Sequence, residues 1–315
     1  MKRKNVVACG IGFKESEGTV TEEPCVVVSV THKVPQAQLT PEDLVPKVLD
    51  SIKTDVQEVG YFRAWQPGPK DRHRPAIPGI SCGHVDVTAG TFGCLVRRGG
   101  DLFILSNNHV LANVNRGSRG DAIIQPARYD GGTPNDQIAT LEEWIPLATG
   151  VQESNCPWAT SAAALMNALA GVLQSSSRVM ALQEQAPENR VDCAIARPLS
   201  PDLIRPDILG IGAPRGVRVG KLGMNVQKSG RTTGYTTGQI TQVGVTVQVD
   251  YQGQMLTFVD QFMATGMSSG GDSGSAVLDM DRYVIGLLFA GSDLATLINP
   301  IQEVTSALNV EVVAG

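Results

Sequence analysis

A serine enclosed by glycines is the residue of this chain best suited to chemistry. The segment Gly270-Gly271-Asp272-Ser273-Gly274-Ser275-Ala276-Val277 ends in a run typical of a buried strand. Glycine permits positive φ and close approach of another chain, so Ser273 can lie on a tight turn with its hydroxyl uncovered. A serine hydroxyl attacks a carbonyl only when a base takes its proton and a third group orients that base. The motif indicates acyl transfer if the chain supplies both, and a glycine-rich hairpin turn if it does not.

His109 is the candidate base. It follows Ser106-Asn107-Asn108 at the end of an apolar run, residues 102–105, that predicts a buried strand. At a strand end the imidazole can face a cleft while the next two residues, Val110 and Leu111, stay inside. Taken alone, such a histidine is more often structural. The presence of the Ser273 motif in the same chain favours the catalytic interpretation.

Two aspartates are candidates for orienting the imidazole and holding its tautomer. Asp136 and Asp192 each begin an apolar run, where an aspartate can also simply cap a turn. Asp192 is preferred because the prolines that follow, from Pro198 to Pro214, put it at the end of one β unit and just before a connector to the next. An acid at that point can stand in the cleft between two units. Asp136 remains the alternative.

The elements before residue 81 are expected to form a separate part of the chain. Residues 1–65 predict a small α+β module with a helix starting at Thr40 and three strands, at residues 6–13, 25–33 and 52–59. The module contains no catalytic set, so we expect it to serve interaction with a regulatory partner, homo-oligomer assembly or covering of the next domain. Residues 66–80 are rich in proline and basic residues and predict a linker with His73 in solvent.

Short strands separated by glycine turns follow, a pattern typical of an all-β barrel or sandwich. We expect a mainly β fold with a first barrel at residues 81–200 and a second at 201–315 that ends in a helix. An insertion at about 146–190 interrupts the first barrel. Its segment 157–171 has the composition of a helix capped by Thr160 or Ser161. This helix either covers the β unit or gates the substrate.

Composition limits the partners that the chain can have. Its 315 residues carry a net charge of −5 with acids and bases interspersed, so no basic surface for nucleic acid or for a membrane is expected. The first residues lack the continuous apolar stretch of a signal peptide, which favours the cytoplasm. The six cysteines have irregular spacings and predict reduced thiols, and Cys82-Gly83-His84 by itself is weak evidence for a metal site. Neither a metal nor a cofactor is expected.

The three motifs, in the order His109, Asp192, Ser273, resemble those of the trypsin-like serine peptidases, whose fold is the chymotrypsin double β-barrel. The resemblance rests on Asn108-His109-Val110, Val191-Asp192-Cys193-Ala194 and Gly271-Asp272-Ser273-Gly274. Residues 228–240 are similar to the hairpin that opens the second barrel in bacterial relatives such as alpha-lytic protease. The N-terminal module and the segment LSNNHVLAN resemble the branch that contains the plant NARROW LEAF peptidases.

This resemblance implies a serine endopeptidase that acts on proteins or peptides without a cofactor. Ser273 would attack the carbonyl, His109 would accept its proton, Asp192 would orient the imidazolium, and the N–H groups of Gly271 and Ser273 would form the oxyanion hole. By the same resemblance the primary substrate pocket has no carboxylate at its base, so an apolar residue is expected before the scissile bond. That pocket would be lined by Met267, Phe289, Ala290, Gly291 and Ser292.

The chain departs from the family at two places. Ser275 replaces a usual glycine, and no Ile-Val-Gly-Gly activation site is present, so zymogen cleavage is not implied. Two alternatives stay open beside an active peptidase: a non-catalytic binding or assembly protein on a protease scaffold, and a peptidase that is latent until a partner rearranges the oxyanion loop. A Ser273 that is inert toward a fluorophosphonate probe favours the first, and labelling that requires a partner favours the second.

Overall fold

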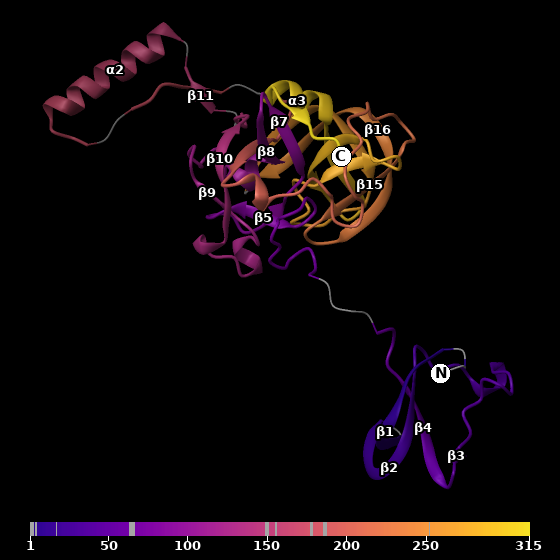
Figure 1. The fold of residues 1–315 in the computed structure, drawn as a ribbon. Coiled ribbons are helices and arrows are strands. Elements are labelled where there is room, and N and C mark those ends of the chain that lie inside the picture. Colours follow the sequence, from indigo (N-terminus) through magenta and orange to yellow (C-terminus); the bar gives the residue numbers. More distant parts are fainter. Residues whose placement is uncertain are drawn as a thin grey trace. The chain divides into compact units, whose positions relative to one another are not determined.

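The computed structural model describes residues 3, 5–16, 18–62, 67–148, 151–154, 156–176, 179–184, 188–251 and 253–315. The chain divides into two compact units, Met1–Gln66 and Pro67–Gly315 (Figure 1). Residues 63–66, where the sequence predicts the end of the module and the start of the linker, lie outside the described residues.

The N-terminal unit contains a four-stranded sheet in the order β1-β2-β4-β3. Its strands are β1 (Val6–Ser16), β2 (Thr19–Val30), β3 (Val48–Leu49) and β4 (Ile52–Glu58). The helix predicted from Thr40 is wrong: residues 41–43 form a turn, and only a short 3-10 turn, η1 (Gln36–Gln38), precedes them. Thr40 does hydrogen-bond Asp43, but Pro46 disfavours helical backbone in the residue before it and so ends the turn.

Residues 67–80, expected as a linker, belong to the second unit and pack into it. Ala76 forms a β-bridge with Ile204, and Ala76 and Ile80 are fully buried. His73 is hydrogen-bonded rather than solvated, because its ring nitrogen Nε2 lies 2.8 Å from the Gly68 carbonyl oxygen. The buried side chains of Ala76 and Ile80 thus anchor this segment.

The first large sheet has eight strands in the order β21-β7-β8-β14-β10-β9-β5-β6. Its strands are β5 (Ser81–His84), β6 (Gly90–Thr91), β7 (Cys94–Arg98), β8 (Asp101–Ser106), β9 (Ala122–Ile124), β10 (Gln137–Trp144), β14 (Ala194–Pro198) and β21 (Glu311–Val312). Apolar side chains of this sheet, among them Leu95, Ile104 and Leu141, form its buried core.

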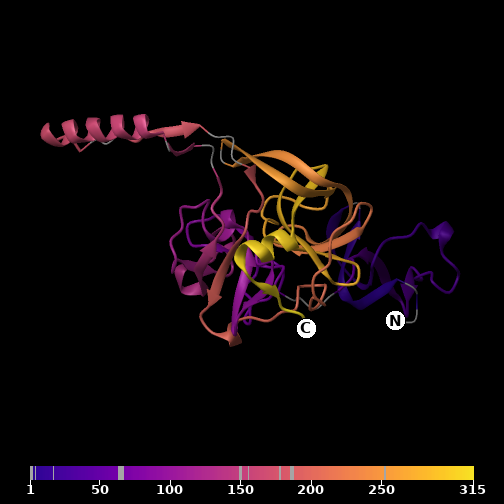
Figure 2. The ribbon, with the colours of Figure 1, turned by 90° about the horizontal axis from the view of Figure 1, so that it is seen from above.

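The second large sheet has seven strands in the order β13-β17-β16-β15-β18-β19-β20, and β17 also pairs with β20, which closes the sheet. Its strands are β13 (Glu188–Asn189), β15 (Asn225–Gly230), β16 (Gly234–Tyr251), β17 (Gln254–Thr265), β18 (Ala276–Asp279), β19 (Val284–Gly291) and β20 (Ala295–Pro300). The C-terminal helix α3 (Ile301–Leu308) packs against β19 and β20. Figures 1 and 2 show the orange and yellow strands of this sheet beside the purple strands of the first.

The insertion in the first barrel contains a helix between two short strands. Strands β11 (Val151–Glu153) and β12 (Leu182–Glu184) pair with each other and flank α2 (Pro157–Val172). The helix begins earlier than the predicted cap at Thr160 or Ser161: Cys156 is its N-cap, because Pro157 is well suited to the first helical position. Within the described residues, no helix is both long and apolar enough to cross a membrane.

The unit Pro67–Gly315 therefore consists of two barrel-like sheets with a helical insertion and a short closing helix. The prediction of a mainly β chain built on two barrels is confirmed. Within the described residues, three further 3-10 turns lie in connections of this unit: η2 (Arg128–Asp130), η3 (Pro134–Asp136) and η4 (Pro201–Leu203).

Candidate active site

His109 and Asp192 lie in direct contact. His109 is in α1 (Asn108–Leu111), a single turn that follows β8, and Asp192 comes just before β14, which pairs with β8. His109 Nδ1 lies 2.5 Å from Asp192 Oδ2, and the His109 backbone N–H donates to Asp192 Oδ1 at 3.3 Å. The Asp192 side chain is fully buried, whereas 20% of the His109 side chain is exposed. This geometry suits an imidazole whose Nδ1–H donates to the carboxylate.

Both large sheets hold Asp192 in place. The Asn107 side-chain amide donates to the Asp192 carbonyl at 2.7 Å, and the Asp192 N–H donates to Asn299 Oδ1 at 3.0 Å. The Tyr251 hydroxyl donates to Asp192 Oδ2 at 2.6 Å. Asn107 precedes α1, while Asn299 and Tyr251 belong to β20 and β16, so the acid is fixed from two sides.

The alternative aspartate has different partners. Asp136 ends a 3-10 turn, η3 (Pro134–Asp136), where its carboxylate accepts hydrogen bonds from Thr133 and from Arg72 at 2.9 Å. These hydrogen bonds, from Thr133 first and then Arg72, lower the pKa of Asp136. The structure therefore brings Asp192, not Asp136, to the imidazole of His109.

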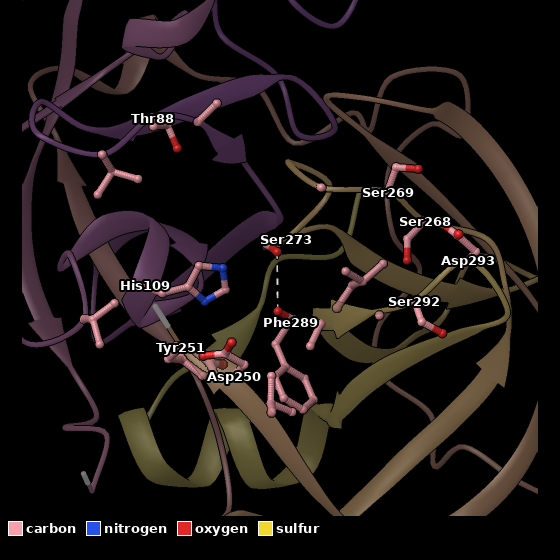
Figure 3. A pocket seen from close by; sticks show the side chains of 18 residues that line it. Thr88, His109, Asp250, Tyr251, Ser268, Ser269, Ser273, Phe289, Ser292 and Asp293 are labelled. Carbon is pink, nitrogen blue, oxygen red and sulfur yellow. Dashed lines mark hydrogen bonds between the residues drawn. The ribbon is translucent and has the colours of Figure 1, made fainter. Parts of the chain in front are cut away.

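Ser273 lies on the loop between β17 and β18 and lines the same cavity as His109. The cavity has a volume of about 450 Å³, and Figure 3 shows both side chains on its wall. Ser273 Oγ donates to the carbonyl oxygen of Phe289 at 3.3 Å. Among the described residues no hydrogen bond joins Ser273 to His109; in enzymes without bound substrate such bonds are often long and tighten only in the reacting complex.

The loop around Ser273 depends on its glycines and on the first sheet. Gly271 and Gly274 have φ of +95° and +93°, and a Cβ on Gly274 would lie 2.0 Å from Ser106 Oγ. Thr91 of β6 holds the loop, because its N–H donates to the Ser273 carbonyl at 2.8 Å and its hydroxyl to the Gly271 carbonyl at 2.9 Å. In the part of the chain that the structure describes, the N–H groups of Gly271 and Ser273 have no hydrogen-bond acceptor.

A buried ion pair supports the loop from below. Asp272 Oδ2 lies 3.1 Å from Lys228 Nζ, and neither side chain is exposed. Burial alone would raise the pKa of Asp272, but the charge of Lys228 and the hydrogen bonds from Thr233 and the loop amides outweigh burial and lower it. Burial lowers the pKa of Lys228, and the charge of Asp272 opposes that effect. The residue next to Ser273 is thus fixed as a carboxylate.

Four of the five residues expected to line the substrate pocket lie on the cavity, and one does not. Phe289, Ala290, Gly291 and Ser292 do line the cavity. Met267 does not: it is 4% exposed and packs in the core of the second sheet with Ile240 and Ile298. The reason is close packing, since the Met267 side chain fills the space beside the backbone of Gly238. Two carboxylates that the sequence did not indicate, Asp250 and Asp293, also line the cavity.

The weak metal candidate forms other contacts. His84 lies 3.0 Å from Asp121 through Nε2, and its Nδ1 accepts from the Asp86 N–H. Burial raises the pKa of Cys82 to about 12, which disfavours the thiolate form that metals bind. Within the described residues, no group of three or more His, Cys, Asp or Glu side chains is placed to hold an ion.

The site is suited to nucleophilic acyl transfer. It combines a histidine ordered by a carboxylate, a serine on the same cavity, and the N–H groups of Gly271 and Ser273, which have no acceptor among the described residues. The contributors that were not predicted from the sequence include Tyr251, Asn299 and Lys228. Tyr251 is 59 positions from Asp192, and no spacing or motif connects them. Lys228 carried a signal, because an isolated lysine inside a strand sequence is worth testing for a buried partner.

The chain is similar to one family model, to a curated plant protein and to several solved structures. Residues 1–58 match the family model of the NARROW LEAF 1 N-terminal domain. Protein NARROW LEAF 1 of Oryza sativa subsp. japonica is 25% identical over 131 residues, which cover 36% of this chain and only 22% of that protein.

Similar solved structures include protease A of Thermobifida fusca and the chymotrypsin of Cellulomonas bogoriensis. The first is 19% identical with a TM-score of 0.49, and the match covers 76% of this chain and 98% of that one. The second is 17% identical with a TM-score of 0.47, and the match covers 76% and 98%. At these values the similarity assigns no activity to this chain.

Proposed function

We propose that this protein is a serine peptidase that hydrolyses peptide bonds through an acyl-enzyme. The observation that carries the proposal is the contact of His109 with the buried Asp192 on the same cavity wall as Ser273. Each of these three residues, taken alone, has ordinary structural roles. Together, around one cavity, they supply a nucleophile, a base and a group that orients the base.

In the proposed reaction, Ser273 Oγ bonds to the substrate carbonyl carbon while its proton moves to His109 Nε2. The N–H groups of Gly271 and Ser273 donate to the developing oxyanion, for which loss of one donor costs about 2.7–4 kcal/mol in comparable sites. His109 then passes the proton to the leaving amine, and the peptide C–N bond breaks. The same imidazole then takes a proton from water, whose oxygen bonds to the acyl carbon. The ester bond to Ser273 Oγ breaks, and the imidazolium returns the proton to Ser273 Oγ, which releases the carboxylic acid product.

We propose an apolar residue before the scissile bond. Leu288, Phe289 and Ala290 line the cavity near Ser273, so apolar residues form part of its wall beside the nucleophile. Asp250 and Asp293 lie on the same cavity, but Asp250 accepts a hydrogen bond from the Gly253 N–H and so belongs to its own turn. This leaves Asp293 as the carboxylate to test.

The test is the labelling rate of the whole chain with a fluorophosphonate probe. Wild type is expected to be labelled, and Ser273→Ala and His109→Ala are expected to lose labelling. Asp192→Asn is expected to be labelled several orders of magnitude more slowly, by analogy with the loss of about 10⁴-fold for such a change. Asp136→Asn removes a carboxylate from a turn away from His109 and is expected to behave as wild type. Labelling that persists in Ser273→Ala would refute the proposal.

The hydrogen bond from Ser273 to Phe289 favours one second candidate, a peptidase that is latent until a ligand or partner shifts the loop. In that case labelling of wild type is absent at first and begins when the ligand is added. Immediate labelling of the isolated chain excludes latency.

A further inference from the structure

Asp192 is a buried carboxylate, and one of its oxygens has two donors. Oδ2 accepts from His109 Nδ1 and from the Tyr251 hydroxyl, which is 2.6 Å away. Oδ1 faces the His109 backbone N–H. A buried charge is costly unless hydrogen-bond donors surround it, so these donors determine how the carboxylate is oriented and how much negative charge it presents to the imidazole.

Tyr251 reaches this carboxylate from the other sheet. It is the last residue of β16, at the end of the hairpin that β16 forms with β17, whereas His109 and Asp192 flank strands of the first sheet. Its ring meets the ring of His109 edge to face, with centroids 5.6 Å apart and an interplanar angle of 81°. Figure 3 shows the two side chains adjacent on the cavity wall.

A row of aromatic rings prevents the phenol from turning away. Tyr251 stacks on Phe258 with centroids 5.8 Å apart, and Phe258 packs on Phe289 at 4.7 Å. Phe258 and Phe289 are both buried. Phe289 is also the residue whose carbonyl accepts the hydrogen bond from Ser273. The row therefore connects the environment of the base with the backbone beside the nucleophile.

We infer that Tyr251 is a positioning residue of the proposed peptidase site: its hydroxyl holds the Asp192 carboxylate in the orientation that receives the Nδ1–H of His109. The effect on turnover rests on the proposed function, whereas the effect on the His109–Asp192 hydrogen bond does not. The hydroxyl also takes up part of the charge of Oδ2. Without the Tyr251 hydroxyl, the Asp192 carboxylate turns more freely. The full negative charge of Asp192 then stabilises the protonated imidazole of His109 more strongly.

The test compares Tyr251→Phe with Tyr235→Phe. Tyr251→Phe keeps the ring and its stacking and removes only the donor; Tyr235 lies on the same strand, is half exposed and is absent from the cavity wall, so it is a matched control. We expect Tyr251→Phe to lower kcat about tenfold, which corresponds to about 1.4 kcal/mol, with little change in KM. The acid limb of kcat/KM is expected to move to higher pH. The carboxylates of Asp250 and Asp293, which also line the cavity, are present in both variants.

A second variant keeps the inference testable if Tyr251→Phe does not fold. Phe258→Leu retains the Tyr251 hydroxyl but removes the ring that holds it, and it is expected to shift the acid limb in the same direction by a smaller amount. Thermal unfolding of each variant establishes that it is folded. A folded Tyr251→Phe with the kcat and acid limb of wild type would overturn the inference.

One readout does not need activity. NMR can follow the proton between His109 and Asp192, and the loss of its resonance in His109→Ala would assign it. In Tyr251→Phe we expect it to broaden through faster exchange with water. If wild type is not labelled by the fluorophosphonate, with or without added ligand, the proposed function fails, and broadening in Tyr251→Phe still supports the positioning of Asp192. An unchanged resonance contradicts the positioning role even where labelling succeeds.

Discussion

Lys228 Nζ and Asp272 Oδ2 lie 3.1 Å apart with neither side chain exposed to solvent, directly beneath the loop that carries Ser273. Lys228 also donates to the carbonyl of Gly234, and Asp272 accepts from the Ser269 and Thr232 N–H groups. The pair therefore connects β15, the start of β16 and the nucleophile loop. Its integrity determines the geometry around Ser273.

Removing one partner of this pair is expected to destabilise the fold. Lys228→Met leaves the Asp272 charge buried without its counter-ion, which typically costs about 3–5 kcal/mol. The free energy of unfolding in urea measures the loss. The double variant Lys228→Met with Asp272→Asn removes both charges and is expected to recover part of it. A single variant with wild-type stability would contradict this account of the pair.

Acid is expected to weaken the fold through Asp272. Its pKa in the folded chain is lowered, so the carboxylate contributes stability that is fully present above the unfolded pKa of about 3.9 and is lost as pH falls through the lower, folded value. The free energy of unfolding of wild type should therefore decline below about pH 4 more steeply than that of Asp272→Asn. Asp260→Asn, which removes an exposed carboxylate, serves as the control. Parallel curves for wild type and Asp272→Asn would show that Asp272 has no part in acid sensitivity.

Thr232 is expected to set the direction of one oxyanion donor. Its hydroxyl donates to the Gly270 carbonyl at 2.7 Å, and in a trans peptide this fixes the opposite direction for the N–H of Gly271. Thr232→Val should lower the fluorophosphonate labelling rate by about tenfold or more, with little change in stability. Thr241→Val is the control, because the hydroxyl of Thr241 in β16 likewise donates to a backbone carbonyl, that of Met263 in β17. Equal labelling rates for Thr232→Val and wild type would show that other contacts set the direction of the Gly271 N–H.

Substrate preference is expected to follow the apolar lining of the cavity. In a chromogenic peptide library, residues such as Leu or Phe before the scissile bond should give the highest kcat/KM. Asp293→Asn should leave this ranking unchanged. Best cleavage after Lys or Arg, abolished in Asp293→Asn, would instead assign the pocket to a basic side chain.

The barrels and the pair of His109 and Asp192 followed from local patterns. Strands such as β8 and β14 are continuous apolar runs ended by polar residues, and this pattern reports burial without knowledge of partners. Asp192 was preferred over Asp136 from its position before the connector, and the structure brings Asp192 to His109. These features depend on short segments of sequence, and so they could be predicted.

The remaining contacts depend on register and on packing at a distance. Tyr251 meets Asp192 because β16 and β17 pair with several register shifts, and no single segment encodes where that long hairpin ends. Met267 is absent from the cavity because the core of the second sheet accommodates it. The helix expected at Thr40 was overruled by a proline six positions later. The outcomes for Tyr251 and Met267 follow from residues remote from the motifs that prompted the predictions, and the outcome for Thr40 follows from a proline just beyond its motif.

A crystal structure of the fluorophosphonate adduct is the sharpest test of Ser273 as the nucleophile and His109 as its base. We expect phosphorus bonded to Ser273 Oγ, a phosphonyl oxygen about 2.7–3.1 Å from the N–H groups of Gly271 and Ser273, and His109 still hydrogen-bonded to Asp192. A phosphonate attached to another residue, or an adduct on Ser273 with its oxygen turned away from both amides, would contradict it.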